Sequence, residues 1–426
     1  MKHAYAFTAA LVAWLVFAPG WWRDLIDVDL WWLLWAGEHA LEHGALPTDN
    51  ALSWTAPDEP WVTHEGGVAL AYALVGLDGV WWLRGLVCSA FGLLVLGMAR
   101  ARGAWATILG LLWLTPLVSI WVSERALTWG LTFLAAEVAL LHGDHRWRLP
   151  LAAGVVALWS AFHGSFLLGV GLLGLFHPGW AVAATLGALL TQGGGLFELV
   201  LSYTVGHGAT ELVHEYVAEW HGLWPDSPLA VAQCLMVALA GGLVLSGRDK
   251  RGWILWAGLT LLTLKHGRHT APFGVVLLPY VVQRLDELLP QKAIGRPMAW
   301  LAAGLVATPL VAPRPVVDAG QFPPGLVEAL RASEAPTYAD FRLSGWLAYH
   351  GTPAFWDSRN DCYPVEVFQD ALRIAYRMDG WKSVLRRHGV GRVATRDPEL
   401  VGALRAIGWR TTAEVADVTV LLSPDA

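Results

Sequence analysis

Acidic side chains stand directly after the first apolar segment of the chain, in the stretch DVDLWWLLWAGEHALEHGALP at residues 27–47. A carboxylate at such a place, here Asp27 or Asp29, can act as a general base. It can also hold a divalent cation such as Mg²⁺ or Mn²⁺ against a phosphate leaving group. The spacing leaves open that these residues simply mark the end of a helix, but ionisable groups at a membrane boundary favour a functional role.

Two Glu-His pairs follow in the same stretch. Glu38, His39, Glu42 and His43 share one face of a helix, which predicts an amphipathic helix over 30–43 that lies on the membrane surface. The string HALEH also matches the H-x-x-E-H pattern of zinc proteases, in which His39 and His43 would bind zinc. The sequence places no third ligand, so a membrane zinc protease is a remote alternative.

A further pair, His64 and Glu65, occurs in PWVTHEGG at residues 60–67. We expect it to line the same cavity as the two aspartates, with Glu65 as another carboxylate; capping of a helix start is the alternative. The apolar segment GVALAYALVG at 67–76 is too short to cross a bilayer, which predicts an interfacial or re-entrant helix.

The elements that must position these groups belong to a membrane protein. The 426 residues are 55% hydrophobic and 15% charged and include 26 Trp, unlike the balance of a soluble domain. Segment 4–22 has no cleavage site, which predicts an uncleaved signal anchor and a cytoplasmic N-terminus. With further apolar segments the predicted number of transmembrane helices is about eleven, an even number being the alternative. These segments lie near 81–98, 104–121, 126–142, 149–162, 164–177, 180–192, 229–246, 252–264, 270–284 and 297–312.

Arginine and lysine in alternate loops place the first long loop, residues 23–80, outside the cytoplasm by the positive-inside rule. After residue 312, Pro and Gly punctuate the chain, and the strand patterns APTYAD, TPAFWDSR, GVGRVATR and VTVLLSP alternate with helix patterns. We therefore expect a transmembrane domain over 1–312 and a soluble extracytoplasmic α/β domain over 313–426. In that domain TPAFWDSR (352–359) predicts a strand, and Asp357 and Arg359 at its end suit either a ligand or an internal ion pair. No basic stripe for nucleic acid is present in the sequence.

Basic groups also occur at predicted outer ends of spans, where the positive-inside rule does not explain them. They are Arg125 in WVSERALTWG, His163 in WSAFHGSF and the cluster KHGRH at 265–269. Lys265, Arg268 and His269 together suit a phosphate or anionic headgroup, with snorkelling to the interface as the alternative. His163 is equally consistent with a packing residue. The loop at 193–228 carries Glu211, Glu215 and Glu219 and predicts a solvated acidic helix, with zinc binding by Glu211, His214 and Glu215 as the alternative.

These stretches resemble the membrane glycosyltransferases of the GT-C superfold, and a broad group of bacterial membrane proteins related to them. The matching stretches are residues 27–65, SERALTWGL, LWSAFHGSFLLG, LKHGRHTAPFGVVLLPYV, SGWLAYHGTPAFWDSRNDCYPVEVFQDAL and IGWRTTAEVADVTVLL. The group usually has Trp and Asn where this chain has Gly66 and Ala161. The resemblance implies a mostly α, polytopic helical fold in the inner (plasma) membrane, with a small C-terminal extracytoplasmic α/β domain.

The resemblance also implies an activity, namely an inverting transfer of sugar from a polyprenyl-phosphate carrier to a lipid, glycan or protein. Asp27 or Asp29 would be the base or metal carboxylate, and Glu65 is the further catalytic candidate. The carrier phosphate would lie on the basic groups Lys265, Arg268, His269 and Arg125, and further cavity candidates are His64, His163 and Glu38. The main alternative is a non-catalytic membrane protein that handles lipid-linked sugars or polysaccharide in transport or assembly.

Overall fold

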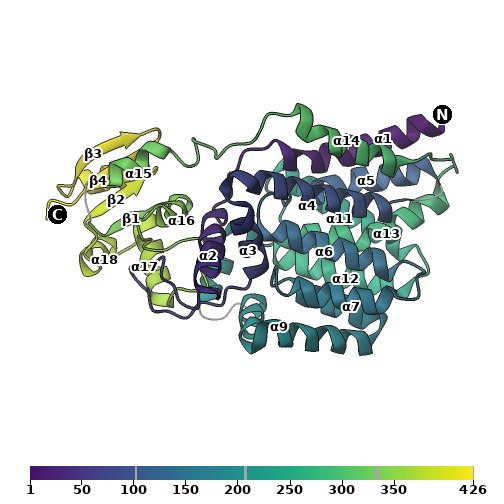
Figure 1. Cartoon of the computed structure of the whole chain (residues 1–426), viewed down its shortest axis with the longest axis horizontal. Coiled ribbons are helices and arrows are strands. Elements are labelled where there is room, and N and C mark those ends of the chain that lie inside the picture. Colours follow the sequence, from purple (N-terminus) through teal and green to yellow (C-terminus); the bar gives the residue numbers. More distant parts are fainter. Residues whose placement is uncertain (101–102, 206–208, 332–334, 426) are drawn as a thin grey trace. The chain divides into compact units, whose positions relative to one another are not determined.

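The computed structural model describes residues 1–100, 103–205, 209–331 and 335–425 (Figure 1). The chain is mostly α-helical and divides into two compact units. Unit 1 comprises Met1–Arg23, Asp78–Val200 and Val217–Pro315. Unit 2 comprises Asp24–Leu77, Leu201–Tyr216 and Val316–Ala426. The boundaries 1–312 and 313–426 remain a prediction.

Unit 1 is a bundle of apolar helices around α13 (Thr270–Leu288), whose residues from Thr270 to Leu278 are all buried. α13 contacts α5, α6, α11 and α12. The helices of this unit are α1 (Lys2–Phe17), η1 (Ala18–Trp21), α4 (Leu77–Met98), α5 (Ala104–Val118), α6 (Ala126–Leu141), α7 (Arg148–Trp159), α8 (Phe166–Phe176), α9 (Pro178–Val205), η2 (Ala218–Trp220), α11 (Pro228–Leu245), α12 (Lys250–Lys265), η3 (Gly267–His269), α13 and α14 (Pro297–Val311). Each apolar segment singled out in the sequence therefore contains helix.

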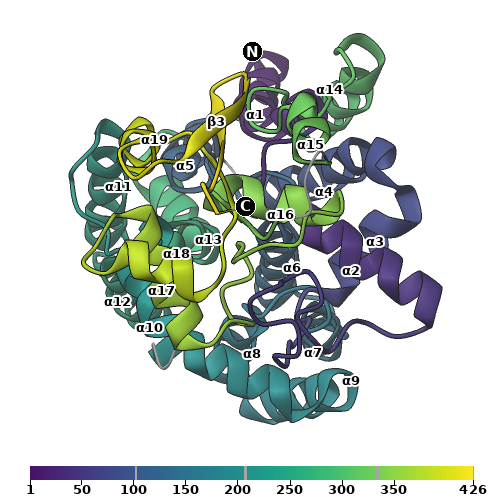
Figure 2. The same cartoon turned by 90° about the vertical axis from the view of Figure 1, so that its left-hand side faces the viewer.

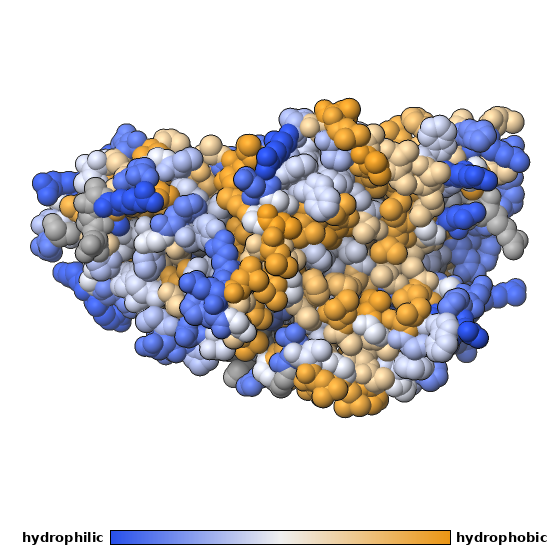
Figure 3. Space-filling view, in the orientation of Figure 1, coloured by the Kyte–Doolittle hydropathy of each residue, from blue (hydrophilic) through white to orange (hydrophobic). Residues whose placement is uncertain are grey.

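Large apolar side chains also cover much of the face of unit 1 that Figure 3 shows. Leu190, Val306, Leu310 and Val311 are among the exposed ones. Such a surface is unfavourable in water and is typical of helices that face lipid. Among the described residues, three helices are long and apolar enough to span a bilayer: Lys2–Trp21, Leu77–Met98 and Pro228–Leu245. A bent pair, Pro178–Gln192 with Gly195–Tyr203, would be a fourth. The predicted number of about eleven spans remains a prediction.

Unit 2 contains a four-stranded sheet in the order β1-β2-β4-β3 (Figure 1), and Figure 2 shows its strand β3 from another side. β1 (Thr337–Ala339) is parallel to β2 (Arg392–Thr395), which is antiparallel to β4 (Val418–Leu422), and β4 is antiparallel to β3 (Arg410–Val415). β2 is buried along its whole length, as expected of a central strand, whereas β3 is mostly exposed. The helices of the unit are α2 (Leu30–His43), α3 (Gly66–Val75), α10 (Ala209–Tyr216), α15 (Pro324–Arg331), α16 (Phe341–Tyr349), α17 (Val365–Ala375), α18 (Trp381–Arg387) and α19 (Pro398–Arg405).

The predicted helix over 30–43 forms as α2, but protein covers its apolar side chains. α2 packs against α3 and α16. Trp31 is fully buried and meets Phe322 edge-on, with ring centroids 5.1 Å apart. Gly37 permits the close crossing with α3, because a Cβ there would lie 2.0 Å from the Ala69 carbonyl oxygen. The expectation of a helix that rests on a membrane surface through its apolar side is therefore corrected, since α2 uses that side for packing within unit 2.

The predicted strand TPAFWDSR is also corrected, because this segment forms a loop held by residues from the first part of the chain. The Ala354 amide donates to the Leu52 carbonyl at 2.8 Å, and the Trp54 amide donates to Ala354 at 3.1 Å. Ala354 forms only an isolated bridge, with Ser53. The residues that follow form turns, so within the described part of the chain this bridge does not extend into a strand.

Candidate active site

Asp27 and Asp29 shape the entry to α2. The Asp29 amide donates to Asp27 Oδ1 at 3.0 Å, which is an Asx turn. Asp29 precedes α2, yet its side chain forms no capping hydrogen bond to that helix. Instead its Oδ1 accepts from the Trp32 indole N–H at 3.3 Å, and the same N–H lies 3.2 Å from Ser358 Oγ. Asp29 is thus placed beside the loop at 356–361.

That loop contains the ion pair that the sequence left as one of two possibilities. Arg359 and Asp357 are fully buried, and the guanidinium contacts both carboxylate oxygens, with an Nη2–Oδ2 distance of 2.6 Å. The Arg359 amide also donates to Asp357 Oδ1 at 3.0 Å. Since each charge is matched by the other, the pair closes the turn and fixes its shape. The guanidinium also lies 4.8 Å from the centre of the Trp61 ring.

The loop brings a further carboxylate, Asp361, to the His64-Glu65 pair. His64 Nδ1 lies 3.8 Å from Asp361 Oδ2, and His64 Nε2 lies 3.6 Å from Glu65 Oε1. Glu65 directly precedes α3, but its side chain does not cap that helix, which removes the capping interpretation of this residue. We call Asp29, His64, Glu65 and Asp361 the acidic site; all four belong to unit 2.

Burial raises the pKa of Asp361 to about 7, and the negative charges of Asp357 and Asp29 act in the same direction. A backbone hydrogen bond and the Arg359 guanidinium oppose this shift without cancelling it. The carboxyl group is therefore poised to gain or lose a proton near neutral pH, which is typical of groups that carry protons in active sites.

Several other buried polar atoms near this loop lack a hydrogen-bond partner within the described part of the chain. They are Asn50 Oδ1, Trp61 Nε1, Arg359 Nη1, Asn360 Oδ1 and Asp361 Oδ2. Buried polar atoms are normally paired, so a group of unpaired ones in one place is uncommon. It is consistent with a site that contacts a polar molecule rather than with a purely structural loop.

The other predicted acidic and histidine candidates have local partners. Glu38 Oε1 accepts from the Tyr349 hydroxyl at 2.9 Å. The His39 and His43 rings stack with centroids 4.2 Å apart. Within the described ranges, no group of three His, Cys, Asp or Glu side chains is arranged to hold a metal ion. Among the described residues, the zinc-protease alternative therefore has no set of three ligands to support it. Asp27 and Asp29 likewise belong to no described group of three ligands that could hold the expected divalent cation.

In unit 1, two of the predicted basic residues converge on one carboxylate. Arg125 Nη1 lies 2.7 Å from Glu219 Oε2, and Arg268 Nη1 lies 3.4 Å from Glu219 Oε1. The Arg268 guanidinium also stacks on the Trp220 ring, 4.2 Å from its centre. We call these four residues the arginine site. Glu219, predicted to be a solvated surface acid, is instead held between two arginines.

The loop that carries Glu219 is attached to the end of α12. His266 Nδ1 lies 2.6 Å from the Trp220 carbonyl oxygen, and the Gly267 amide donates to the His221 carbonyl at 2.6 Å. Burial on its own raises the pKa of Glu219, but the guanidinium groups of Arg125 and Arg268 outweigh it and lower the pKa below its ordinary value. Glu219 is therefore a carboxylate at neutral pH that contacts both arginines.

The remaining basic candidates differ in character. Lys265 is exposed at the end of α12. Burial, with the charges of Arg268, His266 and Lys265, lowers the pKa of His269 to about 3. This shift favours the neutral imidazole at physiological pH, so His269 would meet a phosphate as a neutral hydrogen-bond donor, and its part in phosphate binding stays a prediction. His163 Nδ1 lies 2.6 Å from Ser165 Oγ and accepts from the Ser165 amide at 3.0 Å, as in a packed turn.

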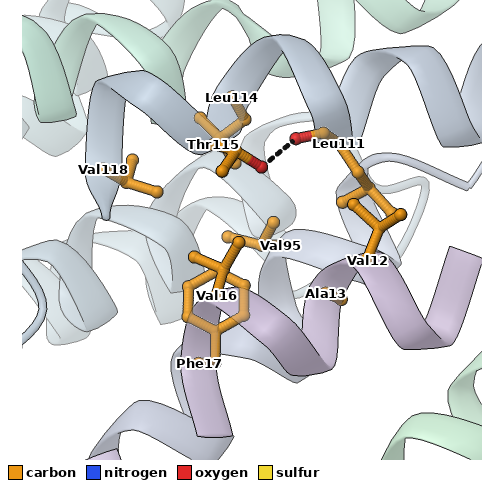
Figure 4. Close-up of a pocket in the computed structure, with 9 residues that line it drawn as sticks. All are labelled: Val12, Ala13, Val16, Phe17, Val95, Leu111, Leu114, Thr115 and Val118. Atoms are coloured by element: carbon orange, nitrogen blue, oxygen red, sulfur yellow. Dashed lines mark hydrogen bonds between the residues drawn. The ribbon is translucent and has the colours of Figure 1, made fainter. Parts of the chain in front are cut away.

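A small pocket of unit 1 lies among α1, α4 and α5 (Figure 4). Its lining consists of apolar side chains such as Val16, Phe17 and Val95, together with Thr115. The Thr115 hydroxyl donates to the Leu111 carbonyl at 2.9 Å within its own helix. The pocket presents no group able to activate a hydroxyl or bind a phosphate, so we do not place the chemistry there.

Sequence reasoning missed Asp361 and the pairing role of Glu219. Asp361 follows a conspicuous ion-pair motif, but its histidine partner lies almost 300 positions earlier in the chain. Glu219 stands among other acidic residues that suggested a solvated helix. The sequence feature that pointed to this pairing was the presence of arginines at predicted outer ends of spans, because arginines in such a position require a carboxylate or another anion.

No protein-family model and no curated protein sequence matches the chain. Among solved structures it is similar to archaeal oligosaccharyltransferase AglB from Archaeoglobus fulgidus, in complex with an inhibitory peptide and a dolichol-phosphate. That match has a TM-score of 0.50 and 8% sequence identity, and covers 92% of this chain and 69% of that chain. The apo form of the Archaeoglobus fulgidus oligosaccharyltransferase gives a TM-score of 0.49 and 10% identity over the same shares. The expected resemblance is thereby confirmed at the level of the fold, which is GT-C-like.

Proposed function

We propose that this protein is an inverting membrane glycosyltransferase. It takes a sugar from a polyprenyl-phosphate carrier and passes it to a lipid, glycan or protein acceptor at the extracytoplasmic face of the plasma membrane. The GT-C-like fold and the exposed apolar helices support this class of protein. The solved oligosaccharyltransferase that resembles the chain holds a dolichol-phosphate and a peptide, which is consistent with a lipid-linked donor and a separate acceptor.

The observation that carries the proposal is the arginine site. Arg125 and Arg268 direct their guanidinium groups at one carboxylate, at 2.7 and 3.4 Å. Arginine forks match a phosphate as well as they match a carboxylate. A carrier phosphate that takes the place of Glu219 would be stabilised as the sugar departs and negative charge grows on the leaving oxygen. Lys265, at the end of the adjoining helix, would add a third cation.

The acidic site would act on the acceptor. Asp29 and Glu65 of this site, with the neighbouring Asp27, supply carboxylates that can take up or relay the proton of an acceptor hydroxyl and stabilise positive charge that develops on the sugar. Inversion requires the acceptor oxygen to attack the anomeric carbon from the side opposite the phosphate. We derive no step through a divalent cation, because the described carboxylates form no sufficient ligand set.

Kinetics of single variants test this assignment of roles. Transfer from a radiolabelled polyprenyl-phosphate sugar is measured with wild type, Arg268→Ala and Asp29→Asn. We expect Arg268→Ala mainly to raise the donor KM, and Asp29→Asn mainly to lower kcat, because one residue binds the donor and the other serves the chemical step. Equal effects of both variants on KM alone would count against a chemical role for the acidic site and favour the lipid-handling alternative.

A further inference from the structure

His64 lies between two carboxylates that come from distant parts of the sequence. Its Nε2 is 3.6 Å from Glu65 Oε1, and its Nδ1 is 3.8 Å from Asp361 Oδ2. Nδ1 also lies 3.2 Å from the Val62 carbonyl oxygen. A carbonyl oxygen only accepts hydrogen bonds, so this contact, which is shorter than the one to Glu65, favours the tautomer that carries its proton on Nδ1 and can accept a proton at Nε2.

Exposure decides which of the three groups can meet a substrate. The His64 side chain is 20% exposed, whereas the side chains of Glu65 and Asp361 are 11% and 3% exposed. An acceptor hydroxyl can therefore reach the imidazole more readily than either carboxylate. The buried pair is placed to act on His64 rather than on the substrate.

The surroundings of Asp361 leave its Oδ2 directed to His64. Arg359 is the nearby cation, but it is engaged by both oxygens of Asp357. Asp357 and Asp29 add negative charge rather than neutralising Asp361. Within the described residues, Oδ2 is buried and accepts no hydrogen bond. A carboxylate in that position stabilises an imidazolium more than a neutral imidazole.

We propose that His64 is the proton acceptor for the acceptor hydroxyl and that Asp361 is the residue that positions it. The inference deepens the proposed glycosyl transfer and rests on it. The hydroxyl O–H bond breaks and its proton passes to His64 Nε2, while the oxygen forms a bond to the anomeric carbon. The bond from that carbon to the carrier oxygen breaks, and its electron pair leaves on the phosphate. Asp361 and Glu65 then face the imidazolium, which returns its proton to water.

The test compares the protonation of two histidines in unit 2, His64 and His388, each of which lies near an aspartate carboxylate. His388 Nε2 lies 2.9 Å from Asp370 Oδ2, and its side chain is 20% exposed, as that of His64 is. The full-length protein in detergent is treated with diethylpyrocarbonate between pH 5 and 9, and modification of each histidine is followed by peptide mass spectrometry. The reagent attacks neutral imidazole, so the pH of half-maximal rate reports protonation of each ring.

We expect Asp361→Asn to lower that pH for His64 by about one unit and to leave His388 unchanged. Asp370→Asn should lower that pH for His388 and leave His64 unchanged, which would show that the method detects such a pair. Asp361→Ser provides a second variant if Asn impairs folding. An unchanged His64 midpoint in both Asp361 variants, with His388 responding to Asp370→Asn, would overturn the pairing.

The same preparations are assayed for sugar transfer across pH. His64→Gln should abolish turnover while donor binding remains, and Asp361→Asn should move the acidic limb of the rate profile in step with the His64 midpoint. Transfer that survives His64→Gln would overturn the role of His64 alone. A shifted midpoint in a protein with no transfer from any donor would instead contradict the proposed function, so the two failures are distinguishable.

Discussion

Arg125 and Glu219 stand 94 positions apart and meet through two guanidinium–carboxylate contacts, of 2.7 and 3.4 Å. Arg268 reaches the same carboxylate from a third segment of unit 1. The protein thus provides its own anion to arginines that the proposed reaction needs for a phosphate. Donor binding would require that Glu219 give up at least part of this contact, and the consequences of that competition are measurable.

Glu219→Gln should tighten binding of a short polyprenyl phosphate by about tenfold, equivalent to about 1.4 kcal/mol, because it removes the competing charge. Binding is measured by titration calorimetry in detergent. Glu287→Gln is the matched control, since Glu287 pairs with Arg284 at an exposed position. Because the arginines lower the pKa of Glu219, the carboxylate loses its charge only as pH falls through that lowered value. The difference from wild type should therefore persist from pH 8 down to pH 5. Weaker binding by Glu219→Gln would show that Glu219 positions the arginines rather than occupying the phosphate position.

Asp361→Asn should raise thermal stability at pH 8 and have little effect at pH 4. The folded protein holds the Asp361 proton up to a pKa of about 7, against an ordinary value of 3.8. The unfolded chain releases that proton at lower pH, so the cost of folding with this group grows from pH 4 to 7, up to about 4 kcal/mol. Melting of the purified protein at both pH values measures the effect.

Asp397→Asn is the control of opposite sign. Burial by itself raises the pKa of Asp397, but its backbone hydrogen bonds and Arg377 together outweigh burial and lower the pKa, so its contribution is present at pH 8 and is lost in acid. Asp397→Asn should therefore lower the melting temperature at pH 8. If Asp361→Asn instead lowers the melting temperature at pH 8, this contradicts the prediction that burial of the charged Asp361 carboxylate destabilises the folded protein.

Gly169→Ala should destabilise the bundle of unit 1 by about 1–3 kcal/mol. A Cβ at Gly169 would lie 2.7 Å from Glu137 Oε2 and 2.8 Å from Trp159 Cζ3, and both of those side chains are buried. Gly171→Ala on the same helix meets nothing within 4 Å and should be neutral or slightly stabilising. Thermal melting of the two variants side by side is the measurement, and equal melting temperatures would contradict this packing.

Arg84 and Glu124 form a buried ion pair at 2.9 Å, with side chains 1% and 0% exposed. Arg84→Met should cost about 3–5 kcal/mol of unfolding free energy because it leaves the carboxylate buried without its cation. The double variant Arg84→Met/Glu124→Gln should cost less than the single one, since no lone charge remains. A double variant that is less stable than Arg84→Met would show that Glu124 stabilises unit 1 through contacts other than this pair. Denaturation in mild detergent compares them.

Local patterns predicted most of the helices because apolar segments long enough to be buried form helix wherever backbone groups lack water. They also predicted β1, β2 and β4, which are short buried runs. β3 and α18 were missed: β3 alternates Thr, Ala and Glu and is mostly exposed, and α18 is only seven residues long. TPAFWDSR has strand composition, but its backbone hydrogen bonds go to the segment around Ser53.

The sequence predicted which kinds of residue form the candidate site, but not which of these residues contact one another. The arginines at predicted outer ends of spans and the acidic residues of the first long loop were identified as candidates from their positions in the predicted membrane topology. Their partners, Glu219 and Asp361, are separated from them by long stretches of chain, and no periodicity encodes such contacts. His269 illustrates the same limit, since its neutral state depends on burial beside Arg268 and is invisible in the string KHGRH.

The most direct test of the proposed activity is sugar transfer by membranes that contain the wild type, Asp29→Asn, His64→Gln or Arg268→Ala, with radiolabelled polyprenyl-phosphate donors and donor binding followed in parallel. The account predicts transfer with inverted anomeric configuration by the wild type. It also predicts loss of turnover with donor binding retained in Asp29→Asn and His64→Gln, and weakened donor binding in Arg268→Ala. Donor binding without turnover in the wild type, across several sugars and acceptors, would contradict it and establish a protein that handles lipid-linked sugars without transferring them.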